Sequence, residues 1–314
     1  MSRIFVFPGQ GSQYVGMGKD LAENFTEARE IFEEVDESLS QKLSKIMFEG
    51  PEDDLNLTEN TQPALMAVSM AVVRILEKQG GMSLADKCDF VAGHSLGEYS
   101  ALTAVGTFDV STCAKLLKLR GQAMQRAVPV GIGSMAAILG LDFADVQKIA
   151  AEASGKEICE AANDNSVGQV VVSGHKGAVE AAVALASERG AKRAIILPVS
   201  APFHCALMQP AAEEMRDALA EATMKAPCVP VIANVTAKAE RESETVRGLL
   251  VDQITGMVRW RESVIYMKEQ GVSEAIELGA GKVLCGLIRR IEGDITTDAA
   301  GTPEQIEALI AKLS

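Results

Sequence analysis

Residues 89–98 read DFVAGHSLGE, and this stretch decides the fold class. Residues 89–92 are a short candidate for a buried strand, and a helical run begins at Glu98. Between them, residues 93–97 match the pattern G-x-S-x-G, a tight strand-to-helix turn that projects a serine hydroxyl out of a sheet. The next backbone N–H and the helix N-terminus then face any oxyanion formed at that serine. The stretch predicts an α/β fold with Ser95 as nucleophile; a plain glycine turn with a capping serine is the alternative.

The segments around this turn extend the α/β pattern. Residues 3–7 alternate like a strand, the glycine loop PGQGSQ follows at residues 8–13, and the stretch after the loop has a helical pattern. Further helices are predicted at residues 63–78, 110–126, 205–224 and 247–270, and further strands at residues 229–232 and 274–277.

The order of elements changes between residues 133 and 197. The pattern there is strand, helix, strand, strand, helix, strand, at residues 135–139, 142–153, 158–162, 169–173, 176–188 and 194–197. This β-α-β-β-α-β order is the ferredoxin-like split unit, which can close a small core of its own. We therefore expect a hydrolase-like parallel-sheet catalytic domain, residues 1–128 and 199–314, with a ferredoxin-like subdomain, residues 129–198, inserted in it.

Composition disfavours several classes of protein. The 314 residues carry 43 acidic and 30 basic side chains, a net charge of −13, so the chain as a whole is repelled by nucleic-acid phosphates. No secretory signal is recognisable at the start, and no apolar run approaches the ~18 residues that cross a bilayer. We expect a cytoplasmic protein that binds neither nucleic acid nor membrane.

Cysteine and histidine are arranged unlike a metal centre. The 6 cysteines form no C-x-x-C pair, which fits reduced thiols, and the 3 histidines never pair at helical spacing. We expect no metal and no disulfide frame.

A nucleophilic serine needs a base within hydrogen-bond reach, and histidine is the usual one. His94 is the chain neighbour of Ser95, where a turn points side chains apart, and His175 lies in the inserted unit. His204 lies at the return into the parent domain, where Pro202 stiffens a loop that opens a helix. Elimination favours His204; a histidine bonded only to local backbone is the alternative.

Arg120 lies in an otherwise apolar helical stretch, LLKLRGQ at residues 116–122. Its planar fork suits a carboxylate, although an ordinary salt-bridged arginine is the alternative.

Two glycine-rich segments are weaker candidates for a ligand-binding site. The match at residues 131–136 to a dinucleotide-binding loop precedes a strand instead of following one, and residues 279–282 fit a helix N-terminal turn better than a phosphate loop.

Taken together, these motifs resemble a known family. The matching segments are residues 8–13, residues 93–98, residues 119–122, Phe203 with His204, and residues 251–255 with Trp260. They resemble the malonyl-CoA:acyl carrier protein transacylases of dissociated fatty acid synthesis and, more distantly, the acyltransferase domains of polyketide and fatty acid synthases. The similarity extends from residue 4 to about residue 290, in the family's order and spacing.

The resemblance implies a role for each matching residue. Ser95 is the acyl-accepting nucleophile, His204 its general base and later acid, and the backbone N–H groups of Gln10 and Leu96 form the oxyanion hole. Arg120 holds the free malonyl carboxylate.

Two further residues complete the implied site. The carbonyl of Gln253 orients the histidine, so a Ser-His dyad is expected without an aspartate. Phe203 goes with malonyl over methylmalonyl in the related synthase domains, but serine is common at this position in the stand-alone enzymes.

The implied reaction is a ping-pong transfer from malonyl-CoA to the phosphopantetheine thiol of acyl carrier protein, supplying fatty acid synthesis. The implied partners are acyl carrier protein, malonyl-CoA and CoA, with no cofactor, and we expect a monomer. Because such carriers are acidic, docking needs a local cationic patch, for which Lys282, Arg289, Arg290 and Arg193 are candidates.

Two other functions compete with this prediction. An α/β-hydrolase esterase or thioesterase shares G-x-S-x-G, but it needs a histidine near the C-terminus and would release malonate to water. A non-catalytic acyl-CoA or carrier-binding protein would have lost the serine or the histidine, and both are present.

Overall fold

A six-stranded sheet organises the larger part of the molecule. The computed structural model describes residues 2–199 and 201–314. The strand order is β10-β9-β1-β2-β7-β8, parallel except for the pair β7 and β8. The strands are β1 (Ser2–Phe7), β2 (Phe90–Gly93), β7 (Val231–Ile232), β8 (Ala239–Glu240), β9 (Val272–Leu278) and β10 (Thr296–Ala300).

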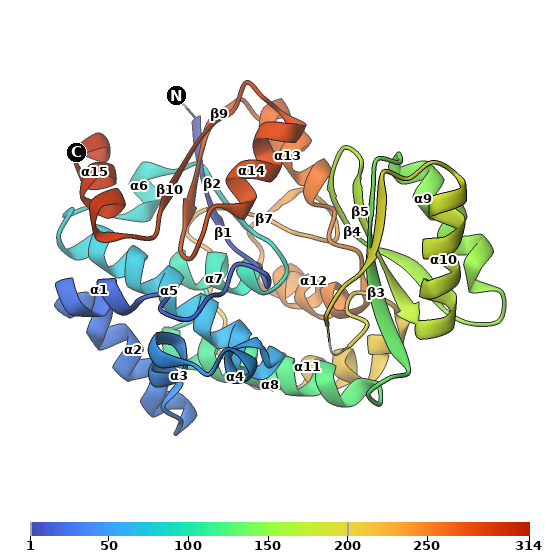
Figure 1. The fold of residues 1–314 in the computed structure, drawn as a ribbon. Helices are drawn as coiled ribbons and strands as arrows, with labels where there is room; N and C mark the ends of the chain where they lie inside the picture. The colour runs from blue at the N-terminus through green and yellow to red at the C-terminus, as the bar shows by residue number, and fades with distance from the viewer. Residues whose placement is uncertain (1, 200) are drawn as a thin grey trace.

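Helices cover both faces of this sheet (Figure 1). Phe5 and Phe7 of β1 pack into the main core, whereas Ile4 and Val6 pack into a second core on the other face with Trp260. This alternation of side chains along one strand places apolar groups on both faces of a parallel sheet.

The helices that precede the inserted unit all pack on the main core. They are α1 (Lys19–Asn24), α2 (Thr26–Leu39), α3 (Leu43–Glu49), α4 (Glu52–Asn56), α5 (Thr58–Lys78), α6 (Leu84–Lys87), α7 (Leu96–Ala104) and α8 (Val110–Ala127). After the inserted unit come η1 (Ala206–Met208), α11 (Gln209–Glu221), α12 (Ser243–Thr255), α13 (Trp260–Glu269), α14 (Val283–Ile291) and α15 (Pro303–Leu313).

The inserted unit forms a second sheet with its own core. Its elements are β3 (Gly133–Leu139), α9 (Phe143–Ser154), β4 (Cys159–Ser166), β5 (Gln169–His175), α10 (Lys176–Glu188) and β6 (Arg193–Ile196). The strand order β4-β5-β3-β6 is antiparallel throughout, with α9 and α10 packed on one separate apolar cluster. The predicted fold class, a parallel-sheet unit with a ferredoxin-like insertion, is confirmed; the domain boundaries at 128/129 and 198/199 stay predictions.

The helix predicted over residues 247–270 is wrong, because the chain breaks into α12 and α13. Between them, the Val258 N–H donates to the Ala162 carbonyl at 2.9 Å, and the Val258 carbonyl accepts from the Asp164 N–H at 3.0 Å. Val258 therefore pairs with the backbone of β4. The helical spacing of apolar residues in the sequence gives no sign of this pairing. The break also joins the inserted unit to the larger part.

Other predicted boundaries also shift. The helical stretch predicted after the glycine loop begins only at Lys19, with α1, because Gly16 and Gly18 adopt positive φ. The helix predicted at 205–224 begins as the short 3₁₀ turn η1 and ends at Glu221. No helix in the described part of the chain is long and apolar enough to cross a membrane.

Candidate active site

The turn between β2 and α7 holds Ser95 in a strained conformation, with φ 53° and ψ −111°. A Cβ at Gly93 would lie 1.9 Å from the backbone of Gly97, and one at Gly97 would lie 2.3 Å from the Phe7 carbonyl oxygen. Only glycine fits at these two positions, which explains the spacing G-x-S-x-G. A strained residue of this kind persists where the surrounding structure fixes it, and it often marks a functional site.

Ser95 and His204 meet although they are 109 residues apart in the chain. The Ser95 Oγ lies 2.8 Å from the His204 Nε2, and the His204 Nδ1 lies 2.8 Å from the backbone carbonyl oxygen of Gln253. A carbonyl can only accept, so Nδ1 carries the proton and Nε2 is free to accept the serine proton. Burial, followed by the charge of Arg120, lowers the pKa of His204 to about 3. The imidazole is therefore neutral and in the tautomer that a general base needs.

The other two histidines have different partners. The His94 Nε2 lies 2.8 Å from the Asn165 Oδ1, and its ring packs against Trp260 with centroids 5.8 Å apart. The His175 Nδ1 accepts from the Ile158 N–H at 3.0 Å inside the inserted unit. The elimination made from the sequence therefore agrees with the geometry.

Arg120 lies beside Ser95 and is 1% exposed. Its Nη2 donates to the Ser95 Oγ at 3.1 Å and to the Gln253 Oε1 at 2.9 Å, and its Nη1 donates to the Gln62 Oε1 at 2.7 Å. Its Nε has no partner, and among the described residues no carboxylate forms an ion pair with it. A buried guanidinium without a counter-ion suits an anionic ligand, since an unpaired buried charge is costly.

The two expected oxyanion donors lie on segments that adjoin the Ser95 turn. Leu96 is the first residue of α7, so its N–H has no carbonyl four residues back within the helix. Gln10 lies in the loop after β1, which approaches the turn closely: a Cβ at Gly9 would lie 2.6 Å from the His94 carbonyl oxygen. The Gln10 side chain is directed to Thr58, with Nε2 3.4 Å from Oγ1, so any contribution to the oxyanion comes from its backbone.

Two site residues were missed by the sequence analysis. The Asn234 Oδ1 accepts from the Ser95 N–H at 2.7 Å, and its Nδ2 donates to the Gly93 carbonyl at 2.7 Å. Glu98, 1% exposed, accepts from the Asn234 N–H and from the Gln253 Nε2. The glutamate stood in the quoted motif, but nothing in the sequence pairs it with residues more than 130 positions away.

Phe203 and a cavity complete the surroundings of His204. Phe203 is buried in the main core. A cavity of about 340 Å³ is lined by His204 and by residues of α9, of β4, and of the end of α12 with the segment after it. The base therefore borders open space where the inserted unit meets the larger part.

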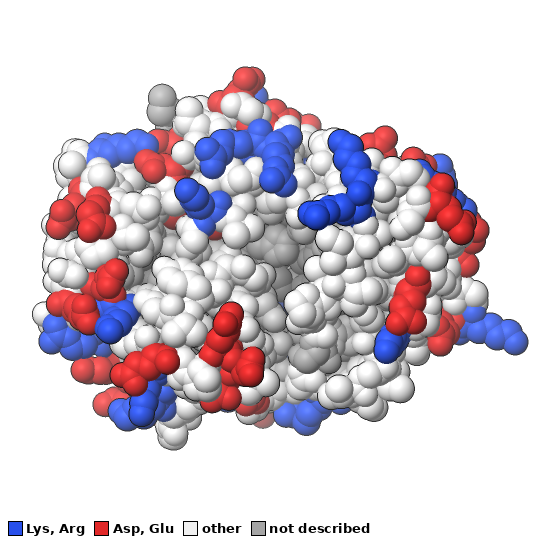
Figure 2. All heavy atoms as spheres, viewed as in Figure 1, with Lys and Arg blue, Asp and Glu red and all other residues white. Residues whose placement is uncertain are grey.

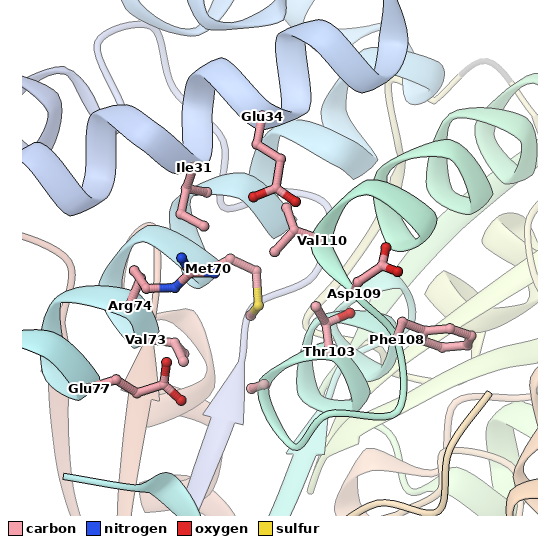
Figure 3. A pocket seen from close by; sticks show the side chains of 11 residues that line it. Ile31, Glu34, Met70, Val73, Arg74, Glu77, Thr103, Phe108, Asp109 and Val110 are labelled. Atoms are coloured by element: carbon pink, nitrogen blue, oxygen red, sulfur yellow. The ribbon is translucent and has the colours of Figure 1, made fainter. Parts of the chain in front are cut away.

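A second hollow, shown in Figure 3, lies between α2, α5, α7 and α8. It measures about 180 Å³, and the described residues that line it include three carboxyl groups and one arginine, Glu34, Glu77, Asp109 and Arg74. Burial raises the pKa of Glu77. Ser95, His204 and Arg120 are not among the described lining residues, so this hollow is separate from the site.

The chemistry available at Ser95 is acyl transfer. An activated serine hydroxyl, a neutral histidine and free backbone donors are the groups that form and stabilise a tetrahedral acyl intermediate. Among the described residues, no cluster of three histidine, cysteine or acidic side chains could hold a metal ion.

Comparison with known proteins gives consistent results. The family described as acyl transferase domain matches residues 4–293. The malonyl CoA-acyl carrier protein transacylase of Escherichia coli is 46% identical over 306 residues, covering 98% of each chain. The crystal structure of an acyl-carrier-protein-S-malonyltransferase from Bartonella henselae is 56% identical, covers 100% of this chain and 99% of that one, and superimposes with a TM-score of 0.98.

A third relative was solved with its partner. It is a malonyl-transacylase in complex with its type II polyketide acyl-carrier protein, 41% identical to this chain. The similarity covers 99% of this chain and 100% of that one, with a TM-score of 0.96.

Proposed function

The chain belongs to the acyl transferase domain family, and from that premise we propose that it transfers the malonyl group of malonyl-CoA to the phosphopantetheine thiol of acyl carrier protein, supplying fatty acid synthesis. The family resemblance found in the motifs is confirmed. The observation that carries the choice of substrate is Arg120, a buried guanidinium without an ion-pair partner in the described structure, 3.1 Å from the Ser95 Oγ.

The first half-reaction forms a malonyl ester on Ser95. The His204 Nε2 takes the hydroxyl proton as the Ser95 Oγ attacks the thioester carbonyl, and the oxyanion is held by the N–H groups of Gln10 and Leu96. The carbon–sulfur bond then breaks, and CoA leaves as a thiol with the proton that His204 returns. Nothing else is consumed.

The second half-reaction reverses these roles. His204 takes the proton of the pantetheine thiol as its sulfur attacks the malonyl ester. The bond to the Ser95 Oγ breaks, and His204 returns the proton to that oxygen. Because CoA must leave before the carrier thiol reacts, the kinetics are ping-pong.

Arg120 contributes both to the selection of the acyl group and to the basicity of His204 during acylation. A neutral acetyl group would leave its buried charge unpaired, a penalty of about 1–3 kcal/mol or more. The same charge also lowers the pKa of His204, after the larger effect of burial. When the malonyl carboxylate pairs with Arg120 this repulsion is offset, so the correct substrate strengthens the base. Phe203, next to His204, would limit space for a methyl branch.

Acyl carrier proteins of this kind are acidic, and this chain has a net charge of −13. Docking therefore needs a local cationic surface on the chain. Figure 2 shows Lys and Arg side chains gathered along the rim of a central hollow, in the region where Figure 1 places α14. Lys282, Arg289 and Arg290 are exposed at the two ends of α14. No carboxylate among the described residues forms an ion pair with any of them. Arg290 reaches the inserted unit through the Gln169 Oε1 at 3.1 Å. These three side chains form the α14 patch, and Arg193 on β6 is a further exposed candidate.

Charge reversal tests the α14 patch. Arg289→Glu with Arg290→Glu should raise the KM for acyl carrier protein about tenfold at low salt, while Lys45→Glu on the exposed side of α3 should leave it unchanged. The difference should shrink as salt is added, since exposed charges are screened. Equal KM values for both variants would remove the patch from carrier docking.

The hydrolase alternative is tested by following CoA release. Without an acceptor, a transacylase should release about one CoA per chain and then stop, and turnover should resume when carrier bearing its pantetheine arm is added. A hydrolase should release CoA and malonate continuously in water. A binding protein should release none.

A further inference from the structure

Glu98 is a buried carboxyl group that the mechanism above does not use. It lies in the first turn of α7 and is 1% exposed. Its Oε2 accepts from the Gln253 Nε2 at 2.7 Å and from the backbone N–H of Asn234 at 3.0 Å. One carboxylate oxygen therefore joins three segments of chain: α7, α12 and the loop after β7.

Each of the two partners holds a reacting group. Gln253 supplies the carbonyl that orients His204, and its side-chain Oε1 accepts from the Arg120 Nη2 at 2.9 Å. Asn234 accepts from the backbone N–H of Ser95 at 2.7 Å. Glu98 is thus hydrogen-bonded to the two residues, Gln253 and Asn234, that position the nucleophile, the base and the cation.

The orientation of the Gln253 amide is the critical step. Its Nε2 is surrounded by acceptors, the Glu98 Oε2 at 2.7 Å and the Ser95 carbonyl at 3.0 Å. Its Oε1 faces the guanidinium of Arg120, which can only donate. A flipped amide would place its NH₂ against the guanidinium and its oxygen against the carboxylate, two contacts without a hydrogen bond. The carboxylate therefore fixes the amide, and the amide fixes Arg120.

We propose that Glu98 is a positioning residue that sets the choice of malonyl over uncharged acyl groups, by holding the Gln253 amide in the orientation that presents Arg120 to the substrate carboxylate. This inference rests on the proposed function. Glu98 does not touch the substrate in this account; it acts through Gln253 on Arg120 and through Asn234 on Ser95.

The location of Glu98 is energetically unfavourable for a purely structural group. Burial raises the pKa of Glu98 to about 7, against the opposing effects of the hydrogen bonds from Asn234 and Gln253 and the charge of Arg120. A neutral hydrogen-bond acceptor could satisfy the same two donors without burying a charge. A carboxyl group at this point is therefore what a functional role at a stability cost would produce.

The test compares single-turnover acylation by malonyl-CoA and by acetyl-CoA, so that the ratio is independent of how much of the protein is folded. Glu98→Ala should lower the malonyl-to-acetyl ratio at least about tenfold, because the Gln253 amide that accepts from Arg120 loses its charge-assisted hydrogen bond to Glu98. Glu98→Gln, which keeps an oxygen facing Gln253 and Asn234, should restore the ratio to within about threefold of the unmodified chain.

Glu274→Ala is the matched control. Glu274 is also a buried carboxyl group, 4% exposed, and it pairs with Lys312 at 2.7 Å and with Arg3. It lies near the start of β9, next to the start of β1, whereas Ser95 follows the end of β2. This variant should lose stability and keep the ratio. If Glu98→Ala yields no folded protein, the comparison of Glu98→Gln with Glu98→Leu takes its place, with the ratio retained in the first and lowered in the second.

The outcomes separate this inference from the proposed function. If the unmodified chain forms no malonyl ester, the proposed function itself fails. If it does, and Glu98→Ala slows both acyl groups equally, Glu98 is only structural. If Glu98→Gln is as unselective as Glu98→Ala, positioning by hydrogen bonds is also wrong.

Discussion

Arg120 is the side chain whose surroundings say most about the substrate. It is buried beside the nucleophile, hydrogen-bonded to two neutral amides and a hydroxyl, and has an Nε without a partner. Its ring neighbour Tyr99, 5.7 Å from the guanidinium carbon to the centroid, adds only a weak attraction. Among the described residues no carboxylate forms an ion pair with the guanidinium, and the charge of Glu98 acts on it only across the Gln253 amide. A substrate carboxylate would therefore be its first direct counter-ion.

Replacing Arg120 by Ala should therefore slow acylation by malonyl-CoA by about 100-fold or more, since a charge-assisted pair to a carboxylate is lost. Acylation by acetyl-CoA should fall much less, so the acetyl-to-malonyl ratio should rise. Arg126→Ala, on the exposed side of the same helix and paired with Glu214, is the control and should change neither rate. An unchanged ratio in Arg120→Ala would exclude the carboxylate role.

The lowered pKa of His204 leads to a prediction about the pH dependence of acylation. An ordinary histidine has a pKa near 6.5, so its base form would decline tenfold per pH unit below that value. Because the pKa of His204 is lowered to about 3, the imidazole stays neutral on acidification. The rate of single-turnover acylation at malonyl-CoA concentrations far below saturation, which reports the free protein, should thus show no loss of the base form of His204 between pH 8 and pH 5. Burial raises the pKa of Glu98 to about 7, so Glu98 itself titrates in this range, and the profile is also measured in Glu98→Gln. A decline in the acylation rate centred near pH 6.5 that persists in this variant would contradict the prediction.

Sequence reasoning found the residues whose chemistry is rare in the chain. Ser95 has a recognisable turn, His204 is one of only 3 histidines, and Arg120 interrupts an apolar stretch. Asn234 and Glu98 escaped, because an asparagine or glutamate becomes a site residue only through contacts made across the fold. Their hydrogen bond joins positions 136 residues apart.

Among the elements, the β2–α7 turn depends most strictly on its sequence. Gly93→Ala would place a methyl group 1.9 Å from the backbone of Gly97. No rotamer relieves this contact, so the turn must open or the chain must fail to fold. We expect a loss of more than about 4 kcal/mol in the free energy of unfolding, together with loss of acylation, measured by chemical denaturation and by ester formation.

Gly248 provides the matched control for this substitution. It lies exposed within α12, and a Cβ there would meet no atom within 4 Å. Gly248→Ala should therefore stabilise the protein by up to about 1 kcal/mol, as alanine is the better helix former. If Gly93→Ala proved as harmless as Gly248→Ala, the described turn geometry would be wrong.

Element prediction succeeded where periodicity is local and failed where pairing is long-range. The predicted range of α10, residues 176–188, coincides with the observed helix, since its apolar positions face one small core. The single helix predicted over 247–270 failed because Val258 pairs with β4. A backbone pairing of that kind leaves no period in the sequence.

At the scale of the whole molecule, the site belongs to neither part alone. Ser95 and Arg120 come from the chain before the inserted unit, whereas His204 and Gln253 follow it, and the cavity beside His204 is lined by α9 and β4 of the insertion. The insertion thus separates the nucleophile from its base in sequence while adding a wall to the site in space. The order of elements predicted the insertion, but neither its contribution to the site nor the pairing that joins the two parts appeared in that order.

The proposed function depends on a malonyl ester formed on Ser95, and intact mass spectrometry tests for this intermediate most directly. After mixing with malonyl-CoA, the chain should gain the mass of one malonyl group, and the adduct should disappear when acyl carrier protein bearing its pantetheine arm is added, with the same mass appearing on the carrier. Ser95→Ala should show no adduct. An adduct that persists in Ser95→Ala, or CoA release from the unmodified chain without any adduct or transfer to the carrier, would contradict the account.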